Sequence, residues 1–186
     1  ATFSGHKFHA VRGVGFVYKK AGKKITPLLT GGGQEKDFRS TTENVAGIAS
    51  MAKALRLVTD KEAFSLPKIA KMKKIIFDEL AKYEDITIFS GEGEDFAPNI
   101  LTFGIKGVRG EVIVHAFEEH QIYISTTSAC SSKAGKPAGT LISMGVPTKL
   151  AQTAVRISLD DDNDMGQVEQ FLTIFKQVYA KTQKVR

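Results

Sequence analysis

The sequence has a single cysteine and lacks any apolar run long enough to cross a lipid bilayer. One thiol cannot form a disulfide within the chain, so a reducing compartment is the simplest setting. A bilayer crossing needs about 20 consecutive apolar residues, and no basic leader followed by an apolar core stands at the start. We therefore expect no membrane partner, no secretory signal and a cytoplasmic location.

Composition and charge are those of a globular protein. Hydrophobic residues make up 42% of the 186 residues and charged residues 25%, which is a typical balance. The net charge is +6, with lysines clustered at Lys19-Lys20, Lys23-Lys24 and Lys73-Lys74. No aromatic residues interleave these lysines and no recognition motif accompanies them, so direct nucleic-acid binding is not expected. We predict that they lie on solvated helix faces and turns.

The first part of the chain has few secondary-structure signals. Alternating apolar residues predict a strand over residues 11–18, and residues 25–29 can return beside it as the second strand of a hairpin. Ser40 and Glu43 have the spacing of a helix N-terminal capping box, and apolar residues follow at helical spacing. The polar stretch 59–67 ends in proline, and we place the main domain boundary there, with the first helix ending before a second one begins.

The later part of the chain has a regular order of elements. From about residue 65 it reads helix, strand, strand, helix, strand, helices, strand, helix. This order predicts an α+β domain with helices on one face of a mainly antiparallel sheet. The first sixty residues contain too few elements to bury one another. We therefore predict two parts: residues 1–62, a hairpin and a linking helix left from a larger domain, and residues 63–186, a small domain.

Lys7 is the sharpest candidate for chemistry. A lysine that forms an imine must reach an aldehyde and lose a proton near neutral pH. Its neighbours Ser4 and His6 can donate hydrogen bonds to a phosphate. The pattern is weak when taken alone, because an isolated lysine is usually a solvated surface group, so both interpretations stay open here.

Cys130 stands in a run of small polar residues. Gly135 and Gly139 follow it, and a loop with so few anchors can swing. A buried structural cysteine usually sits in an apolar strand instead. The residues leave two interpretations, a mobile nucleophile or an inert exposed thiol.

Arg156 alternates with Val155 and Ile157 in a predicted strand, which puts its guanidinium on the other face of that strand. A guanidinium fork fits a carboxylate through two hydrogen bonds. An ion pair with the aspartates at positions 160–164 is the competing interpretation.

Other polar residues have ordinary alternatives. Thr42 can donate to a phosphate, but it can equally cap the following helix. His115 and His120 have no metal-ligand companions, so packing or exposure is preferred. The acidic run 160–164 lacks the spacing of a calcium loop and is expected to cap the last helix. We predict no metal site.

Four stretches, taken together and in order, resemble the C-terminal half of cysteine desulfurases, which are pyridoxal phosphate enzymes of the class V aminotransferase group. They are Ser4-Gly5-His6-Lys7-Phe8-His9, Gly31-Gly32-Gly33-Gln34-Glu35 with Arg39-Ser40-Thr41-Thr42-Glu43-Asn44, Ser128-Ala129-Cys130, and Val155-Arg156-Ile157-Ser158-Leu159. The resemblance covers nearly the whole chain. It makes residues 1–62 the C-terminal remnant of a large α/β cofactor domain.

The resemblance implies a set of cofactor contacts. Lys7 would be the Schiff-base lysine for pyridoxal 5'-phosphate, with Ser4 and His6 on the cofactor phosphate. Thr42 would reach the phosphate of the partner subunit in a homodimer. Thr41 stands where the family usually has glycine, which is a departure at this motif.

The resemblance also implies a reaction. Arg156 would hold the α-carboxylate of L-cysteine, and Cys130 would accept sulfur as a persulfide while the substrate becomes L-alanine. An iron–sulfur scaffold protein or a tRNA-thiolation enzyme would then take the sulfur. Other cofactor ligands come from a preceding half in this family, so this chain alone is expected to be inactive, and its own cofactor binding stays open. The alternatives are a selenocysteine lyase or other class V lyase, and a silent fragment that acts only in docking or dimerisation.

Overall fold

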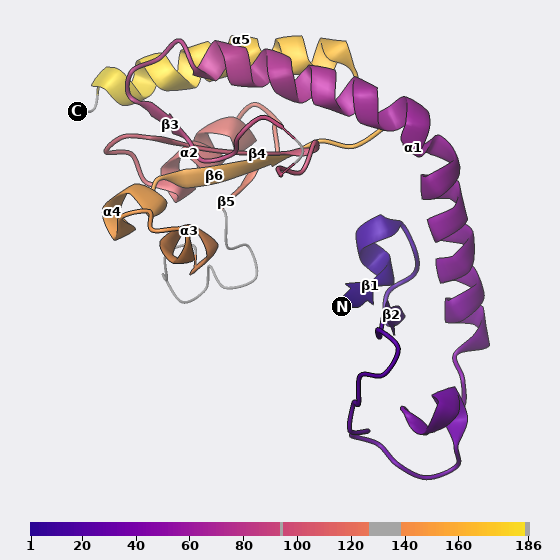
Figure 1. Cartoon of the computed structure of the whole chain (residues 1–186). Helices are drawn as coiled ribbons and strands as arrows, with labels where there is room; N and C mark the ends of the chain where they lie inside the picture. The colour runs from indigo at the N-terminus through magenta and orange to yellow at the C-terminus, as the bar shows by residue number, and fades with distance from the viewer. Residues whose placement is uncertain (94, 127–138, 185–186) are drawn as a thin grey trace. The chain divides into compact units, whose positions relative to one another are not determined.

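The computed structural model describes residues 1–93, 95–126 and 139–184. The chain divides into two compact units, Ala1–Ala63 and Phe64–Arg186. In chain order the elements are β1 (Thr2–Ser4), η1 (Gly5–Phe8), β2 (Gly15–Val17), η2 (Gln34–Asp37), α1 (Val45–Leu80), β3 (Ile86–Ile88), β4 (Ile100–Ile105), α2 (Gly110–Glu118), β5 (Ser125–Thr126), α3 (Gly139–Ser143), α4 (Thr148–Ala151), β6 (Ala154–Ser158) and α5 (Met165–Lys184) (Figure 1). None of the helices within the described residues combines the length and apolar character needed to span a bilayer.

The N-terminal unit contains a two-stranded sheet in which β1 pairs antiparallel with β2. Phe3 lies opposite Phe16, and their rings stack with centroids 4.7 Å apart. The expected return strand at residues 25–29 is wrong, because this stretch contains no strand. Its Pro27 has no N–H to donate to a ladder, whereas the aromatic pair stabilises the pairing with the upstream strand.

Helix α1 is capped by a different residue from the one expected. The N–H of Gly47 donates to Oδ1 of Asn44 at 3.0 Å, so Asn44 is the N-cap. The predicted capping box of Ser40 and Glu43 is therefore wrong. Asparagine caps as well as serine does, and it stands directly before the first helical residue.

Helix α1 continues through Pro67 instead of ending there, so the predicted stop is also wrong. Proline lacks the N–H that would donate to the carbonyl of Ala63, and the division between the two units falls directly after that residue. Beyond Pro67 the helix has a strong apolar face, since Ile69, Met72 and Ile76 are buried. Burial of this face stabilises the helix despite the missing hydrogen bond.

The C-terminal unit is built on a four-stranded antiparallel sheet with the order β3-β4-β6-β5. Three helical segments, α2, α5 and the last part of α1, cover one face of it. This arrangement confirms the α+β fold with helices on one face of an antiparallel sheet. The strands predicted at 86–89 and 100–105 are present, and the one predicted at 122–126 is reduced to β5.

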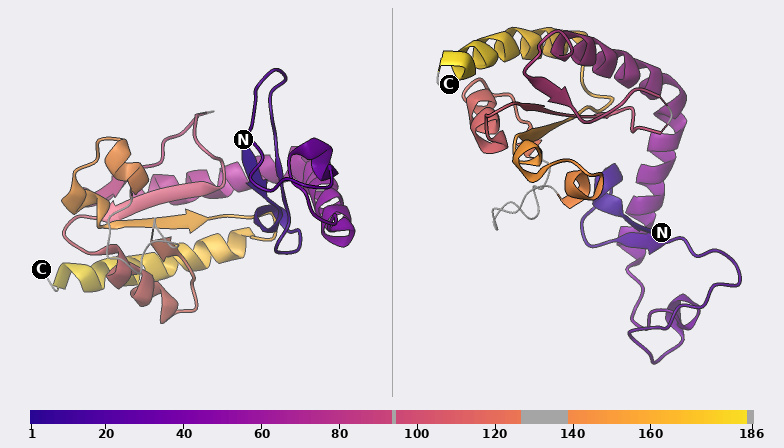
Figure 2. Two further views of the ribbon diagram at one scale, coloured as in Figure 1. Left: turned by 90° about the horizontal axis from the view of Figure 1, so that it is seen from below. Right: turned by 60° about the vertical axis from the view of Figure 1, so that its left-hand side comes forward.

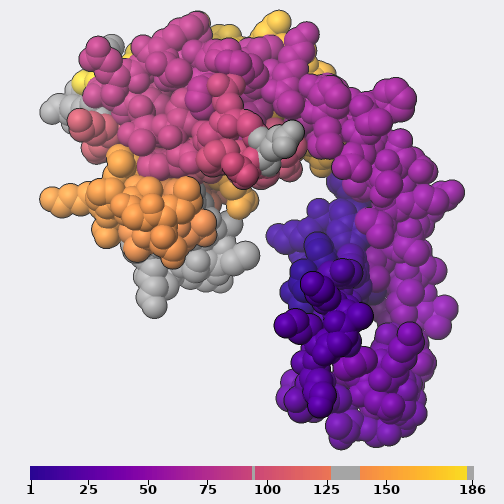
Figure 3. Space-filling model, viewed as in Figure 1, coloured from indigo at the N-terminus to yellow at the C-terminus, as the bar shows by residue number. Residues whose placement is uncertain are grey.

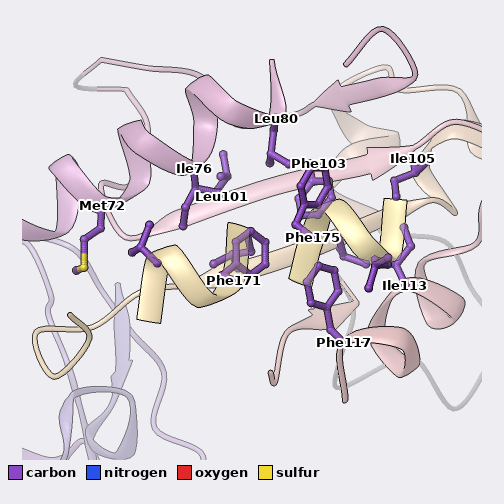
Figure 4. Packing of buried hydrophobic residues seen from close by; sticks show 14 of the residues in the cluster. Met72, Ile76, Leu80, Leu101, Phe103, Ile105, Ile113, Phe117, Phe171 and Phe175 are labelled. Atoms are coloured by element: carbon purple, nitrogen blue, oxygen red, sulfur yellow. The ribbon is translucent and has the colours of Figure 1, made fainter. Parts of the chain in front are cut away.

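The core of this unit lies between the sheet and those helices (Figure 4). Phe103 of β4 meets Phe175 of α5 edge-on at 6.3 Å, and Phe117 of α2 stacks on Phe171 of α5 at 5.1 Å. Burying one such ring stabilises the fold by about 1.5–3 kcal/mol. The sheet is thereby held as a rigid support for the side chains on its other face.

The opposite side of the sheet has a much smaller apolar cluster. Leu141 of α3 and Ala151 of α4 pack with Ala154 of β6. The ribbon views show α3 and α4 on the side of the sheet away from α5 (Figures 1 and 2), and the space-filling view shows them as a separate lobe of the unit (Figure 3). This cluster covers one end of β6 only.

Candidate active site

Lys7 lies on the connection between the two strands of the N-terminal unit, within η1. Two main-chain hydrogen bonds close the turn: Gly5 N–H donates to the Val14 carbonyl at 2.9 Å, and Ala10 N–H donates to the Gly5 carbonyl at 3.0 Å. Gly5 is buried, and a Cβ there would lie 3.0 Å from both Ala10 and Val14. Glycine therefore lets the backbone close tightly behind Lys7.

Ser4, His6 and Lys7 fall in this one turn, and all three are exposed. Among the described residues the Lys7 amine has no ion pair and no hydrogen bond. The turn thus offers one amine, one hydroxyl and one imidazole, which are the groups needed to hold an aldehyde that carries a phosphate. This donor set fits pyridoxal phosphate.

Thr42 is exposed in the loop that precedes α1. Because Asn44 caps the helix, capping does not occupy the Thr42 hydroxyl. Earlier in the same loop Gly31 and Gly33 have φ angles of +151° and +84°, in the region that favours glycine. Residues 35–37 also have positive φ, so this loop holds a sparsely populated backbone conformation.

Arg156 lies in the middle of β6 on the face opposite the main core, as the alternation with buried Val155 and Ile157 predicted. Its Nε is buried and has no hydrogen-bond partner in the part of the chain that the structure describes. The competing ion pair with the aspartates after β6 is not formed there. No carboxylate of the described residues therefore balances the positive charge of this guanidinium.

The aspartates after β6 organise the start of α5 instead. Asp164 Oδ1 accepts from the N–H of Gln167 at 2.9 Å, and Asn163 Oδ1 accepts from the N–H of Asp160 at 2.8 Å. The Asp164 bond is the helix capping that the acidic run predicted, and the Asn163 bond closes the turn before the helix.

His115 of α2 and His120, just after that helix, are not hydrogen-bonded to each other in the part of the chain that the structure describes. His115 is exposed and its Nδ1 lies 2.8 Å from Glu118. His120 is half-buried, and its Nε2 lacks a partner among the described residues. Packing and exposure, as expected, account for both positions.

Lys73 is a buried amine that the sequence analysis placed on a solvated helix face, and that placement is wrong. Only 7% of it is exposed. Its Nζ donates to the carbonyls of Ala97 at 2.9 Å and Gly91 at 3.3 Å. Burial lowers its pKa below the ordinary value, against the opposing charge of Glu92. These bonds fasten the β3–β4 loop to α1, so we assign Lys73 a structural role.

The structure thus brings some of the predicted residues together. Ser4, His6 and Lys7 share one turn of the N-terminal unit, and Arg156 stands on the sheet of the C-terminal unit. Cys130, the predicted sulfur acceptor, lies outside the described residues.

Comparison with known proteins places the chain in a family. A family model for class V aminotransferases matches residues 1–171. The chain therefore belongs to the class V aminotransferase family, which confirms the resemblance drawn from the four motifs.

Curated relatives are similar along nearly the whole chain. A NifS/IcsS protein homolog of Lactobacillus delbrueckii subsp. bulgaricus is 46% identical over 184 residues, covering 99% of this chain and 48% of the relative. The cysteine desulfurase IscS of Dictyoglomus turgidum is 34% identical over 158 residues, covering 85% of this chain and 40% of the relative. The chain spans about half the length of the curated relatives it matches.

Solved structures agree with this assignment. A NifS-like protein from Rickettsia africae has a TM-score of 0.82 and 31% identity, over 96% of this chain and 47% of that one. A further NifS-like protein has a TM-score of 0.80 and 30% identity, over 96% of this chain and 45% of the other.

Proposed function

We propose that this chain is the C-terminal half of a pyridoxal phosphate-dependent cysteine desulfurase. Such an enzyme converts L-cysteine to L-alanine and keeps the sulfur as a persulfide, here on Cys130. The observation that carries the proposal is Arg156, a guanidinium on the face of the sheet opposite the main core, with no carboxylate partner among the described residues. The names of the relatives support the same activity.

Lys7 is the residue that would hold the cofactor covalently, with Ser4 and His6 on its phosphate. Pyridoxal phosphate, when bound, withdraws electrons from the α-carbon of an amino acid and so makes its proton acidic. The Lys7 amine then accepts that proton at Nζ as a general base. Its exposure and its lack of an ion pair within the described part of the chain leave the amine available for both tasks.

Arg156 orients the substrate. Two parallel hydrogen bonds from a guanidinium fix both the position and the plane of a carboxylate. A substrate held in this way meets the attacking thiol as an effectively intramolecular partner.

Cys130 carries the sulfur transfer. Its thiolate attacks the sulfur of the substrate, so a sulfur–sulfur bond forms and the bond from Cβ to sulfur breaks. The electron pair of the broken bond stays on the substrate carbon, which takes up a proton and becomes alanine. The sum of L-cysteine and one thiol is thus L-alanine and one persulfide, and no outside oxidant is needed.

The proposal also includes a second subunit, a sulfur acceptor, a cellular compartment and a division into domains. Thr42 would reach the cofactor phosphate of a second subunit in a homodimer, and the persulfide sulfur would pass to an iron–sulfur scaffold or a tRNA-thiolation enzyme. A free Cys130 thiol favours the reducing cytoplasm. Residues 1–62 would belong to the large cofactor domain and residues 63–186 to the small domain.

Replacement of the thiol tests this function. In the full-length protein, Cys130→Ala should still bind cofactor and L-cysteine but release less than about 1% of the wild-type sulfide, because the nucleophile is absent. Sulfide release and persulfide labelling with L-cysteine measure this. Unchanged persulfide transfer would exclude the role of Cys130. A wild-type protein without any desulfuration would favour a docking-only protein, and a strong preference for selenocysteine would favour a lyase.

A further inference from the structure

The buried residues of the N-terminal unit are all small. They are Gly5, Ala10, Gly47 and Ala54. The first two lie on the connection between β1 and β2, residues 5–14, which we call the Lys7 turn, and the last two lie on the first part of α1. The ribbon views show this turn beside that part of the helix (Figures 1 and 2). Small side chains let two stretches of backbone approach closely, so the Lys7 turn can lie directly against α1.

A hydroxyl of α1 joins the helix to the Lys7 turn. Ser50 Oγ accepts a hydrogen bond from the N–H of Val11 at 3.4 Å. Ser50 is half-buried, and its spacing from Gly47 and Ala54 puts it on the same face of the helix as these two buried residues. The hydroxyl therefore lies on the face of α1 that meets the turn.

The Ser50 bond differs in kind from the bonds within the turn. The N–H of Gly5 donates to the Val14 carbonyl, and the N–H of Ala10 donates to the Gly5 carbonyl. These two bonds give the turn its shape, whereas the bond to Ser50 joins it to another element of the unit. A turn that is fastened to a helix in this way carries its exposed side chains, including that of Lys7, in a fixed direction.

We propose that Ser50 is a positioning residue for Lys7. Its hydroxyl holds Val11 against α1, restricts motion of the Lys7 turn and so keeps the Lys7 amine where it must take up a proton. Proton transfer needs the two heavy atoms within about 2.6–3.2 Å of each other, so a looser turn slows this step more than it weakens substrate binding. The inference rests on the proposed function, in which Lys7 holds the cofactor and acts as the base.

Hydrogen exchange of the full-length protein tests the bond to Ser50 directly. Ser50→Ala removes the acceptor, so the amide of Val11 should exchange with deuterium at least about threefold faster than in the wild type. Mass spectrometry with fragmentation to single residues measures this rate. Alanine is a better helix former than serine, so faster exchange in the turn cannot come from a weaker helix.

Thr59→Val is the matched control. It also removes a hydroxyl from α1, but Thr59 Oγ1 donates to the Leu55 carbonyl of its own helix at 3.0 Å. The exchange of the Val11 amide should therefore stay at the wild-type rate in this variant. Equal exchange of that amide in Ser50→Ala and the wild type would overturn the proposal.

Single-turnover kinetics of the full-length enzyme give a second, independent readout. At saturating L-cysteine, Ser50→Ala should form L-alanine about threefold more slowly than the wild type, because the Lys7 amine is held less often in the geometry for proton transfer. The L-cysteine concentration that gives half the maximal rate should stay within about twofold of the wild type, since Arg156 is unchanged. A rise in that concentration at an unchanged maximal rate would contradict the assigned role.

A conservative variant separates the hydroxyl from the rest of the side chain. Ser50→Thr keeps the acceptor, so it should retain the wild-type exchange rate at Val11 and the wild-type rate of alanine formation. If it behaves like Ser50→Ala, the hydroxyl is not the positioning group. A wild-type protein without desulfurase activity would contradict the proposed function, while the exchange of the Val11 amide would still decide whether Ser50 fastens the turn.

Discussion

Glu79 shows how one carboxylate joins two helices of the C-terminal unit. It lies on α1 with 13% of its side chain exposed, bonds Lys82 at 2.6 Å and pairs with Lys176 of α5 at 3.3 Å. It also accepts a hydrogen bond from the Tyr83 hydroxyl at 3.3 Å. The hydrogen bond from Lys82 is the main reason that the pKa of Glu79 is lowered below its ordinary value of 4.5.

This lowered pKa makes the contribution of Glu79 to stability depend on pH. The unfolded chain takes up the proton first, so the contribution is complete above about pH 4.5 and is lost as the pH falls through the folded-state pKa. At pH 7 we expect Glu79→Gln to lower the free energy of unfolding by about 1 kcal/mol. Urea unfolding at several pH values should show the difference from wild type shrinking below that window. The exposed Glu84→Gln is the control, and a difference for Glu79→Gln that persists unchanged at low pH would contradict the account.

Single residues also show what the sequence could predict about the site. The alternation of Val155 and Ile157 correctly placed Arg156 on the face of its strand opposite the main core. The residues opposite Arg156 could not be predicted, because Thr102 and Ser125 come beside it only through strand pairing between distant parts of the chain.

At the scale of elements, periodic patterns were reliable and short or interrupted ones were not. The buried alternation of β4 and β6 and the apolar faces of α2 and α5 predicted those elements correctly. β1 has three residues, too few for a period, so its pairing with β2 was missed. The prediction also ended α1 at proline, although packing of the following turns outweighs one lost hydrogen bond.

A substitution at Pro67 tests whether packing of α1 outweighs the hydrogen bond that the proline removes. Pro67→Ala restores the N–H that can donate to the Ala63 carbonyl, so we expect a gain in unfolding free energy of about 1–3 kcal/mol. Amide exchange should show the new N–H at position 67 protected, and urea unfolding gives the energy. Lys71→Ala, an exposed change on the same helix, should stay within about 0.5 kcal/mol of wild type. A loss of stability in Pro67→Ala would mean that the helix depends on the proline.

At the scale of the molecule, the sequence identified the family more securely than it identified any single site residue. The four motifs are individually weak, but their order across the chain pointed to class V aminotransferases, and the family match over residues 1–171 confirms it. In the proposed function each unit would contribute part of the chemistry, since the Lys7 turn belongs to the N-terminal unit and Arg156 to the C-terminal unit.

The most direct test of the proposed enzyme is to map where its cofactor binds. Borohydride reduction of the full-length protein loaded with pyridoxal phosphate, followed by proteolysis and mass spectrometry, should give one labelled peptide that contains Lys7, because reduction fixes the cofactor to the amine that holds it. A label on Lys73, the buried amine with a lowered pKa, or on any other lysine in place of Lys7, would contradict the account.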